Sequence, residues 1–168
     1  MMKVSLSLPL GGVFLAALAA LPVMAQDMRF DPAPTESCLA ASGDGAQDCI
    51  GRAASACMAQ PMGETTLGMG FCLDAELSLW DEKLNAAYQQ LRGDYADRDS
   101  ERMEGAPAMA DALRDMQRGW IGFRDARCSF AAAQWEGGTG AGPAFLGCMM
   151  QMTAEQTLFL WSVADDAG

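Results

Sequence analysis

The six cysteines set the tightest limit on how this 168-residue chain can fold. Their number is even, none of them forms the CxxC spacing typical of zinc sites, and the chain contains no histidine. In an oxidising compartment such a set typically forms disulfides, here three. We therefore expect a small fold stapled by disulfides among Cys38, Cys49, Cys57, Cys72, Cys128 and Cys148.

Six cysteines allow about 15 different pairings, and the sequence does not choose among most of them. One pair is favoured by its position, because Cys128 and Cys148 flank a glycine-rich segment. A disulfide there would close a short loop and contribute about 3 kcal/mol of stability through the entropy of the unfolded chain. The partners of the other four cysteines stay open.

The amino terminus carries the pattern of a secretory signal. Lys3 precedes an apolar run from Leu6 to Leu21, and Val23 and Ala25 supply small residues before a cut at Gln26. The run contains a proline and two glycines and is short for a membrane span, which needs roughly 20 apolar residues. We predict that residues 1–25 are removed and that the mature protein is periplasmic or secreted, with no membrane span.

Charge excludes one class of partner. The whole chain has a net charge of −11, and loss of Lys3 with the signal makes the mature chain one unit more negative. Nucleic-acid binding needs clustered lysine and arginine, so this chain is not expected to bind nucleic acid. Strong acidity speeds the encounter with a cationic protein, although it also serves simply to keep a protein soluble.

The mature chain is expected to form one all-α domain, a small disulfide-stapled bundle of about four helices. Residues 26–45 contain two prolines and no periodic apolar pattern, which predicts an irregular lead-in before a helical domain over residues 46–165. A short first helix is expected over residues 46–60. No strand pattern is present.

The second helix has the clearest apolar stripe in the chain, with spacings that alternate between four and three. Thr66 is a plausible N-cap and Gly93 a plausible stop. The stripe consists of Leu73, Leu77, Trp80, Leu84, Ala87 and Leu91.

An acidic segment follows this helix. Residues 94–104 hold five acids, and alternation of Asp97, Asp99 and Glu101 invites comparison with a calcium loop. An EF-hand loop starting at Asp97 would need glycine and glutamate where Arg102 and Ala108 stand. We therefore expect no metal and no cofactor, and interpret the segment as a solvated linker or frayed helical extension.

Two further helices are predicted. The third runs from Pro107 to about Ala133 and should pack against the second, and the fourth covers residues 144–164, with Pro143 in its first turn. Between them, residues 136–144 form a flexible glycine loop that lacks the strand and lysine of a phosphate-binding loop. The apolar stripe of the third helix is Met109, Leu113, Met116, Trp120, Phe123 and Phe130, and that of the fourth is Phe145, Met149, Met152, Phe159 and Val163.

Three stretches together resemble a known family: WDEKLNAAYQQL at 80–91, MQRGWIGFRDARCSF at 116–130, and the glycine loop with Cys148. They are similar to the LprI-like lysozyme inhibitors, secreted bacterial helical domains, over roughly residues 72–160. Where that family usually carries an arginine after a threonine of the last helix, Thr153 is followed here by Glu155 and Gln156. The residues that match the family motif are Leu84, Asn85, Tyr88, Gln117, Arg118, Trp120, Phe123, Arg124, Asp125 and Cys128.

The motif also has a purely structural interpretation. Trp120 and Phe123 lie at helical spacing and are expected to pack in the core, with Leu84 and Tyr88 as the facing surface. Arg124 should be partly buried, and a buried guanidinium needs a carboxylate, for which Glu76 or Asp81 of the second helix is available.

No catalytic residues are expected. Histidine is absent, the cysteines are expected to be oxidised, and no GxSxG motif occurs. Two hypotheses remain: an inhibitor of a cationic lysozyme-type glycosidase, which the resemblance implies, and a periplasmic structural or adaptor module with another protein partner. For the inhibitor, an exposed loop or an acidic surface could form the contact. The candidate partner-binding residues are Asp94, Asp97, Asp99, Glu101, Glu104, Gly138 and Gly140.

Overall fold

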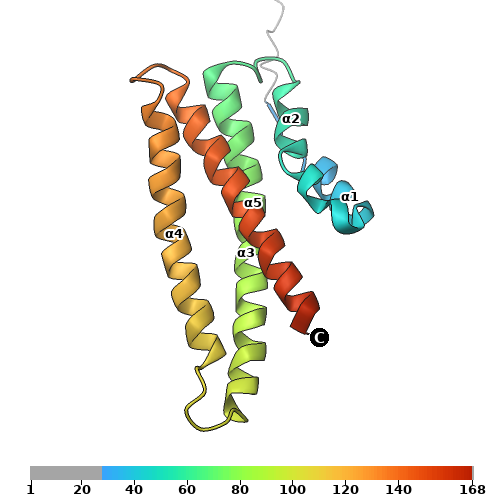
Figure 1. The fold of residues 1–168 in the computed structure, drawn as a ribbon. Coiled ribbons are helices and arrows are strands. Elements are labelled where there is room, and N and C mark those ends of the chain that lie inside the picture. The colour runs from blue at the N-terminus through green and yellow to red at the C-terminus, as the bar shows by residue number, and fades with distance from the viewer. Residues whose placement is uncertain (1–27, 168) are drawn as a thin grey trace, which may run out of the picture.

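The computed structural model describes residues 28–167, so the expected signal sequence, residues 1–25, lies outside the described residues. Within that range every regular element is helical, which confirms the all-α class. Residues 28–167 form five α-helices rather than about four, together with one 3-10 helix (Figure 1). In chain order these elements are α1 Ala33–Ala41, η1 Gly43–Cys49, α2 Arg52–Met58, α3 Thr66–Ser100, α4 Met109–Ala133 and α5 Ala141–Ala167.

Three long helices form the body of the protein. α3, α4 and α5 are in mutual contact, with α5 crossing α3 along much of its length (Figure 1). α1 and α2 lie beside α3, on the side away from α4. At 1.5 Å per residue, the 35 residues of α3 span about 50 Å, so the bundle is elongated.

The stripe predicted for residues 73–91 is the centre of the core. Its members Trp80, Leu84, Ala87 and Leu91 are buried. One apolar cluster joins Trp80 to α2 and α5 through Cys57, Cys72, Met150 and Ala154. A second, the lower apolar cluster, joins Leu84 and Leu91 to Leu113 of α4 and Leu160 of α5. No helix in the described range is long and apolar enough to cross a membrane.

The segment expected to be an irregular lead-in is instead partly helical. α1 occupies residues 33–41, with Pro34 at its start, where the missing N–H is not needed. Two long-range constraints, invisible in local sequence, hold it in place: the Cys38–Cys49 disulfide and the fully buried side chain of Thr35.

The prediction of one helix over residues 46–60 is also wrong in detail. It is divided into η1 and α2 at Gly51, whose φ of +83° is a left-handed conformation that glycine tolerates readily.

The expected ends of the second helix are also displaced. The N-cap is Thr65, whose hydroxyl accepts a hydrogen bond from the Gly68 amide, rather than Thr66. Gly93 does not end the helix, which continues to Ser100 because Tyr95 packs onto the lower apolar cluster and Asp99 binds the start of α4.

The third and fourth helices lie where the sequence places them, but their apolar stripes are only partly buried. Phe123 and Phe130 of α4 are 60% and 65% exposed, and Phe159 of α5 is 49% exposed. The face of α4 that meets the bundle contains Leu113, Gln117 and Cys128. Trp120 is half-buried beside the lower cluster rather than in its centre.

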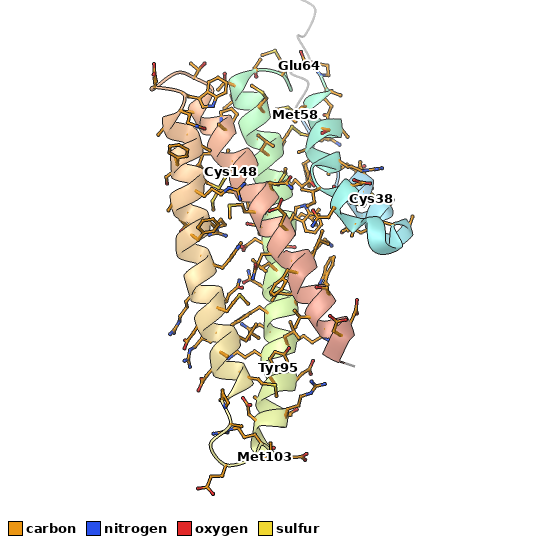
Figure 2. All side chains as sticks on the ribbon, in the orientation of Figure 1. Cys38, Met58, Glu64, Tyr95, Met103 and Cys148 are labelled. Carbon is orange, nitrogen blue, oxygen red and sulfur yellow. A yellow bond between two sulfur atoms is a disulfide. The ribbon has the colours of Figure 1, made fainter. Side chains whose placement is uncertain are left out.

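The six cysteines form three disulfides between successive parts of the chain. Cys38–Cys49 joins α1 to η1, and Cys57–Cys72 joins α2 to α3. Cys128–Cys148, the pair favoured from the sequence, joins α4 to α5; Figure 2 labels Cys38 and Cys148 at their places in the fold.

Candidate functional site

The residues of the family motif are divided between the core and the surface of α3 and α4. Leu84 and Cys128 are buried, and buried Gln117 accepts a hydrogen bond from the amide of Gln156 on α5 at 3.0 Å. Tyr88 packs at the edge of the lower cluster. In contrast, Asn85, Arg118, Phe123 and Asp125 are exposed. The motif therefore mainly specifies how α3, α4 and α5 pack.

Arg124 does not form the ion pair expected from the sequence. Its guanidinium pairs with the neighbouring Asp125 at 2.9 Å, donates to the hydroxyl of Thr153 at 3.4 Å, and lies 4.9 Å from the centre of the Trp120 ring. Its side chain is only 14% exposed. Asp81 lies across a shallow groove of about 390 Å³ that Arg124 also lines, together with Glu82 and Met149.

Glu76, the other proposed partner, has a role that the sequence did not reveal. Its carboxylate is fully buried and accepts hydrogen bonds from the Thr35 hydroxyl at 2.9 Å and the Trp80 indole at 3.1 Å. It also accepts from the backbone amides of Gly51 at 2.8 Å and Ala54 at 2.6 Å. These amides belong to the first turn of α2, so Glu76 caps that helix from α3.

The Glu76 cluster is structural rather than catalytic in character. All of its donors are satisfied within the protein, and Thr35 further accepts from the Ala53 amide at 3.0 Å. Among the residues described, no buried side-chain nitrogen or oxygen is without a hydrogen-bond partner. The same part of the chain holds no group of three or more acidic or cysteine side chains suited to a metal ion.

The glycine loop is a compact turn rather than a flexible connection. The Gly138 amide donates to the Trp135 carbonyl at 2.7 Å, and the Ala141 amide donates to the Gly138 carbonyl at 3.1 Å. Gly137 has a φ of +85°, and a Cβ at Gly140 would collide with the Trp135 ring. Trp135 itself remains 54% exposed, so the turn presents a held aromatic side chain at one end of the bundle.

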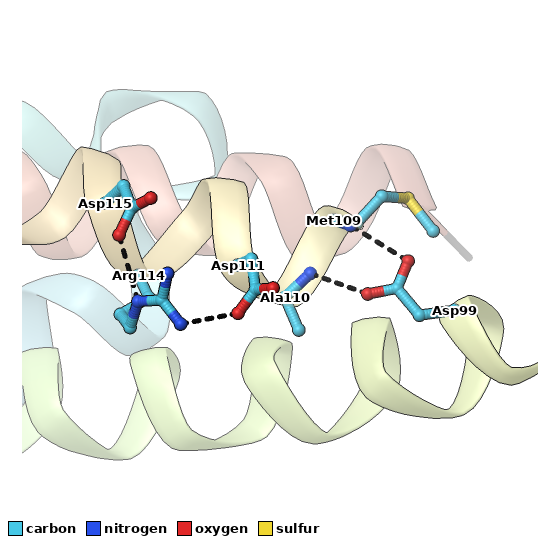
Figure 3. Close-up of polar contacts among 6 residues, drawn as sticks. All are labelled: Asp99, Met109, Ala110, Asp111, Arg114 and Asp115. Carbon is cyan, nitrogen blue, oxygen red and sulfur yellow. Dashed lines mark hydrogen bonds and ion pairs between the residues drawn. The ribbon is translucent and has the colours of Figure 1, made fainter. Parts of the chain in front are cut away.

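The acidic segment lies at the end of α3 and the start of the following loop. Asp94, Asp97, Glu101 and Glu104 are exposed. Asp99 differs, because its carboxylate accepts from the amides of Met109 at 2.8 Å and Ala110 at 3.0 Å and so caps α4 (Figure 3). These backbone hydrogen bonds, that of Ala110 most strongly, hold the pKa of Asp99 below its usual value of 3.8.

A further charged cluster lies one turn along α4. Arg114 pairs with both Asp111 and Asp115 on the surface of the helix (Figure 3). The hydrogen bond to Arg114 lowers the pKa of Asp115, and the two carboxylates raise the pKa of Arg114. The carboxylates of Asp111 and Asp115 are therefore partly balanced by Arg114.

The two candidate contact surfaces are far apart. Met103 lies in the α3–α4 loop at one end of the bundle, whereas Glu64 lies just before α3 at the other end (Figure 2). The turn over residues 135–140 joins α4 to α5 at this second end (Figure 1). Separated by roughly the length of α3, about 50 Å, the acidic segment and the glycine turn do not form one site.

Two known bacterial proteins are similar in sequence to this chain. The chain is 26% identical over 136 residues to an uncharacterized 17.7 kDa protein in the puhA 5' region of Rhodobacter capsulatus, which covers 77% of this chain and 84% of the relative. It is 28% identical over 104 residues to an uncharacterized protein of Rhizobium meliloti (strain 1021), covering 60% of this chain and 75% of the relative. No solved structure matches the chain.

A protein-family model adds the decisive comparison. It matches residues 57–160, from the end of α2 through most of α5, and so includes all three long helices and two of the disulfides. Because this match covers more than half of the chain, the protein belongs to the family described as lysozyme inhibitor LprI.

Proposed function

We propose that this chain is a secreted acidic binding protein that binds and inhibits a cationic lysozyme-type glycosidase. The observation that carries the proposal is the family match over residues 57–160. Cross-linking by three disulfides suits a protein exported to an oxidising compartment.

The distribution of charge leaves Glu136, beside the turn, without a basic residue in its part of the sequence. Residues 92–133 contain eight acids and seven arginines, so the acidic segment lies in a region that is nearly neutral overall. Residues 134–167 contain four acids and no lysine or arginine. Of these four acids, Glu136 lies in the turn beside Trp135, whereas Asp165 and Asp166 lie at the other end of α5.

Trp135 is the side chain best suited to anchor a partner. Large aromatic residues dominate binding energy at protein interfaces when they enter a pocket of the partner. The ring is exposed but already held over Gly140, so little side-chain entropy would be lost on binding. We propose that Trp135 and Glu136 enter the partner's cleft, while Asp94, Asp97, Glu101 and Glu104 contribute to long-range attraction.

Binding kinetics and a cell-wall lysis assay with a cationic lysozyme test the proposal. Wild-type protein should slow lysis, and its association rate should fall as salt is raised. Trp135→Ala should weaken binding at least about 10-fold, in keeping with an interface anchor. Met103→Ala is the matched control, since Met103 is an exposed apolar residue at the opposite end and should leave binding unchanged.

A second variant tests whether the exposed acids of residues 94–104 attract the partner at long range. Exchanging Asp94, Asp97, Glu101 and Glu104 for their amides removes four charges but leaves the Asp99 cap intact, so association should slow while dissociation changes little. If wild type neither binds lysozyme nor protects cell walls at low salt, the lysozyme target is wrong. The alternative hypothesis, a periplasmic structural or adaptor module with another protein partner, would then replace it.

A further inference from the structure

One face of α4 carries an apolar stripe that is exposed along the helix, most strongly at its two phenylalanines. Its residues recur at alternating spacings of three and four from one end of the helix to the other, and all eight are exposed. Phe123 and Phe130 leave most of their surface to solvent. The stripe consists of Met109, Ala112, Met116, Gly119, Phe123, Ala126, Phe130 and Ala133.

The period of this stripe indicates a helix as its partner. Apolar residues that repeat every 3.5 positions on average form the seam of a coiled coil, in which side chains of one helix fill gaps on the other. The large residues Met109, Met116, Phe123 and Phe130 are seven apart. The other positions of the stripe hold only alanine or glycine.

This alternation is complementary to itself when the direction of the helix is reversed. In an antiparallel pair centred on residue 121, Met116 faces Ala126 of a second copy, and Gly119 faces Phe123. The outer positions follow the same rule, so that Met109 faces Ala133 and Ala112 faces Phe130. Every contact then pairs one large side chain with one small one, whereas a parallel pair would stack phenylalanine on phenylalanine and alanine on alanine.

A pocket on the bundle lies where this register needs one. Beside Ala112, a mainly apolar pocket of about 300 Å³ is lined by Met109, Met116, Phe159 and Leu160. In the antiparallel pair, Ala112 is the residue that Phe130 of the second copy faces. The pocket therefore offers a place for that exposed ring and continues the seam from α4 onto α5.

The charges of the molecule also allow two copies to approach here. The region containing α4, residues 92–133, is nearly neutral, whereas residues 28–91 hold nine acids and three basic residues. α1, which carries Glu36 of that acidic part, lies on the far side of α3 from α4 (Figure 1). Two charged residues of opposite sign lie directly beside the stripe: Asp115 on one side and Arg127 on the other.

From these observations we propose that the α4 stripe binds the same stripe of a second copy, giving an antiparallel homodimer with two-fold symmetry. Such a contact is isologous and closes on itself without forming filaments. α4 is 25 residues long, and contact along it would bury on the order of 1,000 Å² in total, near the lower limit for specific interfaces. The dimer should therefore be reversible, with dissociation at micromolar concentrations.

Analytical ultracentrifugation of the mature, disulfide-intact protein over a concentration series tests this proposal. Wild type should show a concentration-dependent monomer–dimer equilibrium. Gly119→Phe should weaken the dimer at least about 10-fold, because it would place two phenylalanines where only one fits. Gly93→Phe on α3 is the matched control: both glycines are exposed and helical, and neither has an atom within 4 Å of an added Cβ.

A compensating change tests the register. Adding Phe123→Ala to Gly119→Phe restores one large and one small residue at each central contact, so the double variant should regain dimerisation. The proposal is overturned if wild type remains monomeric throughout the series, or if Gly119→Phe dimerises as well as Gly93→Phe. Failure of the double variant to recover would reject the antiparallel register.

Discussion

The carboxylate of Glu76 on α3 accepts a hydrogen bond from the hydroxyl of Thr35 on α1 at 2.9 Å, and both side chains are fully buried. Two amides of α2 donate to the same carboxylate. One acidic side chain therefore holds α1, α2 and α3 together, and these hydrogen bonds replace the hydration that the buried carboxylate has lost.

Glu76→Ala should strongly destabilise the protein. Each buried donor that loses its acceptor costs about 1–3 kcal/mol, so we expect a loss of at least about 3 kcal/mol of unfolding free energy. Glu82→Ala, an exposed acid on the same helix, should change stability by less than about 0.5 kcal/mol. Urea denaturation with the disulfides intact measures both, and equal effects would contradict the proposed role of Glu76.

Asp99 should make stability depend on pH. Its pKa is lowered in the folded protein, so its contribution is fully present above its ordinary pKa of 3.8 and is lost as pH falls through the lower folded value. Asp99→Ala should therefore have a lower melting temperature than wild type at pH 6, and the difference should shrink in acid. The exposed Asp97→Ala serves as control; a difference independent of pH would contradict the capping role.

The two tryptophans of the motif helices should differ in their effect on folding. Trp80 is fully buried, and Trp80→Ala should cost about 3–5 kcal/mol. Trp120 is half-buried, so Trp120→Ala should cost distinctly less, although it would also remove the ring beneath Arg124. Chemical denaturation of both variants measures the difference, and a larger cost at Trp120 would support its placement in the core.

The α4–α5 disulfide should stabilise the end that carries the Trp135 turn. Replacing Cys128 and Cys148 together with serine opens a link between residues 20 apart and should cost about 3 kcal/mol. Thiol titration of unreduced wild type should find no reactive cysteine. A titratable thiol, or no change in the melting temperature of the double variant, would contradict the structural role of this link.

Much of the fold could be predicted from local sequence because α3, α4 and α5 are long enough for their periodicity to be clear. The stripe ending at Leu91 identified the buried face of α3 correctly. α1 could not be found in this way, because it depends on Cys49 and Glu76, which are distant in sequence. The prediction that α3 ends at Gly93 was also wrong, because the packing of Tyr95 outweighs the weak helix propensity of one glycine.

The surface of α4 shows a second limit of periodicity. Phe123 and Phe130 were expected in the core because they are large and apolar, yet α4 meets the bundle through Leu113, Gln117 and Cys128. A helix with apolar residues on two faces does not itself reveal which face is internal. Arg124 was also expected to pair with an acid of α3, but its guanidinium pairs with the carboxylate of the adjacent residue Asp125.

The buried carboxylate also bears on where the independently folding unit begins. The family match starts at Cys57, but three of the four groups that donate to Glu76 belong to Thr35, Gly51 and Ala54, upstream of that point. A fragment limited to residues 57–160 would keep Glu76 and retain only the indole of Trp80 among these donors. We therefore expect such a fragment to expose this acid to solvent and to fold poorly, whereas a fragment beginning at residue 28 would fold as one cooperative unit.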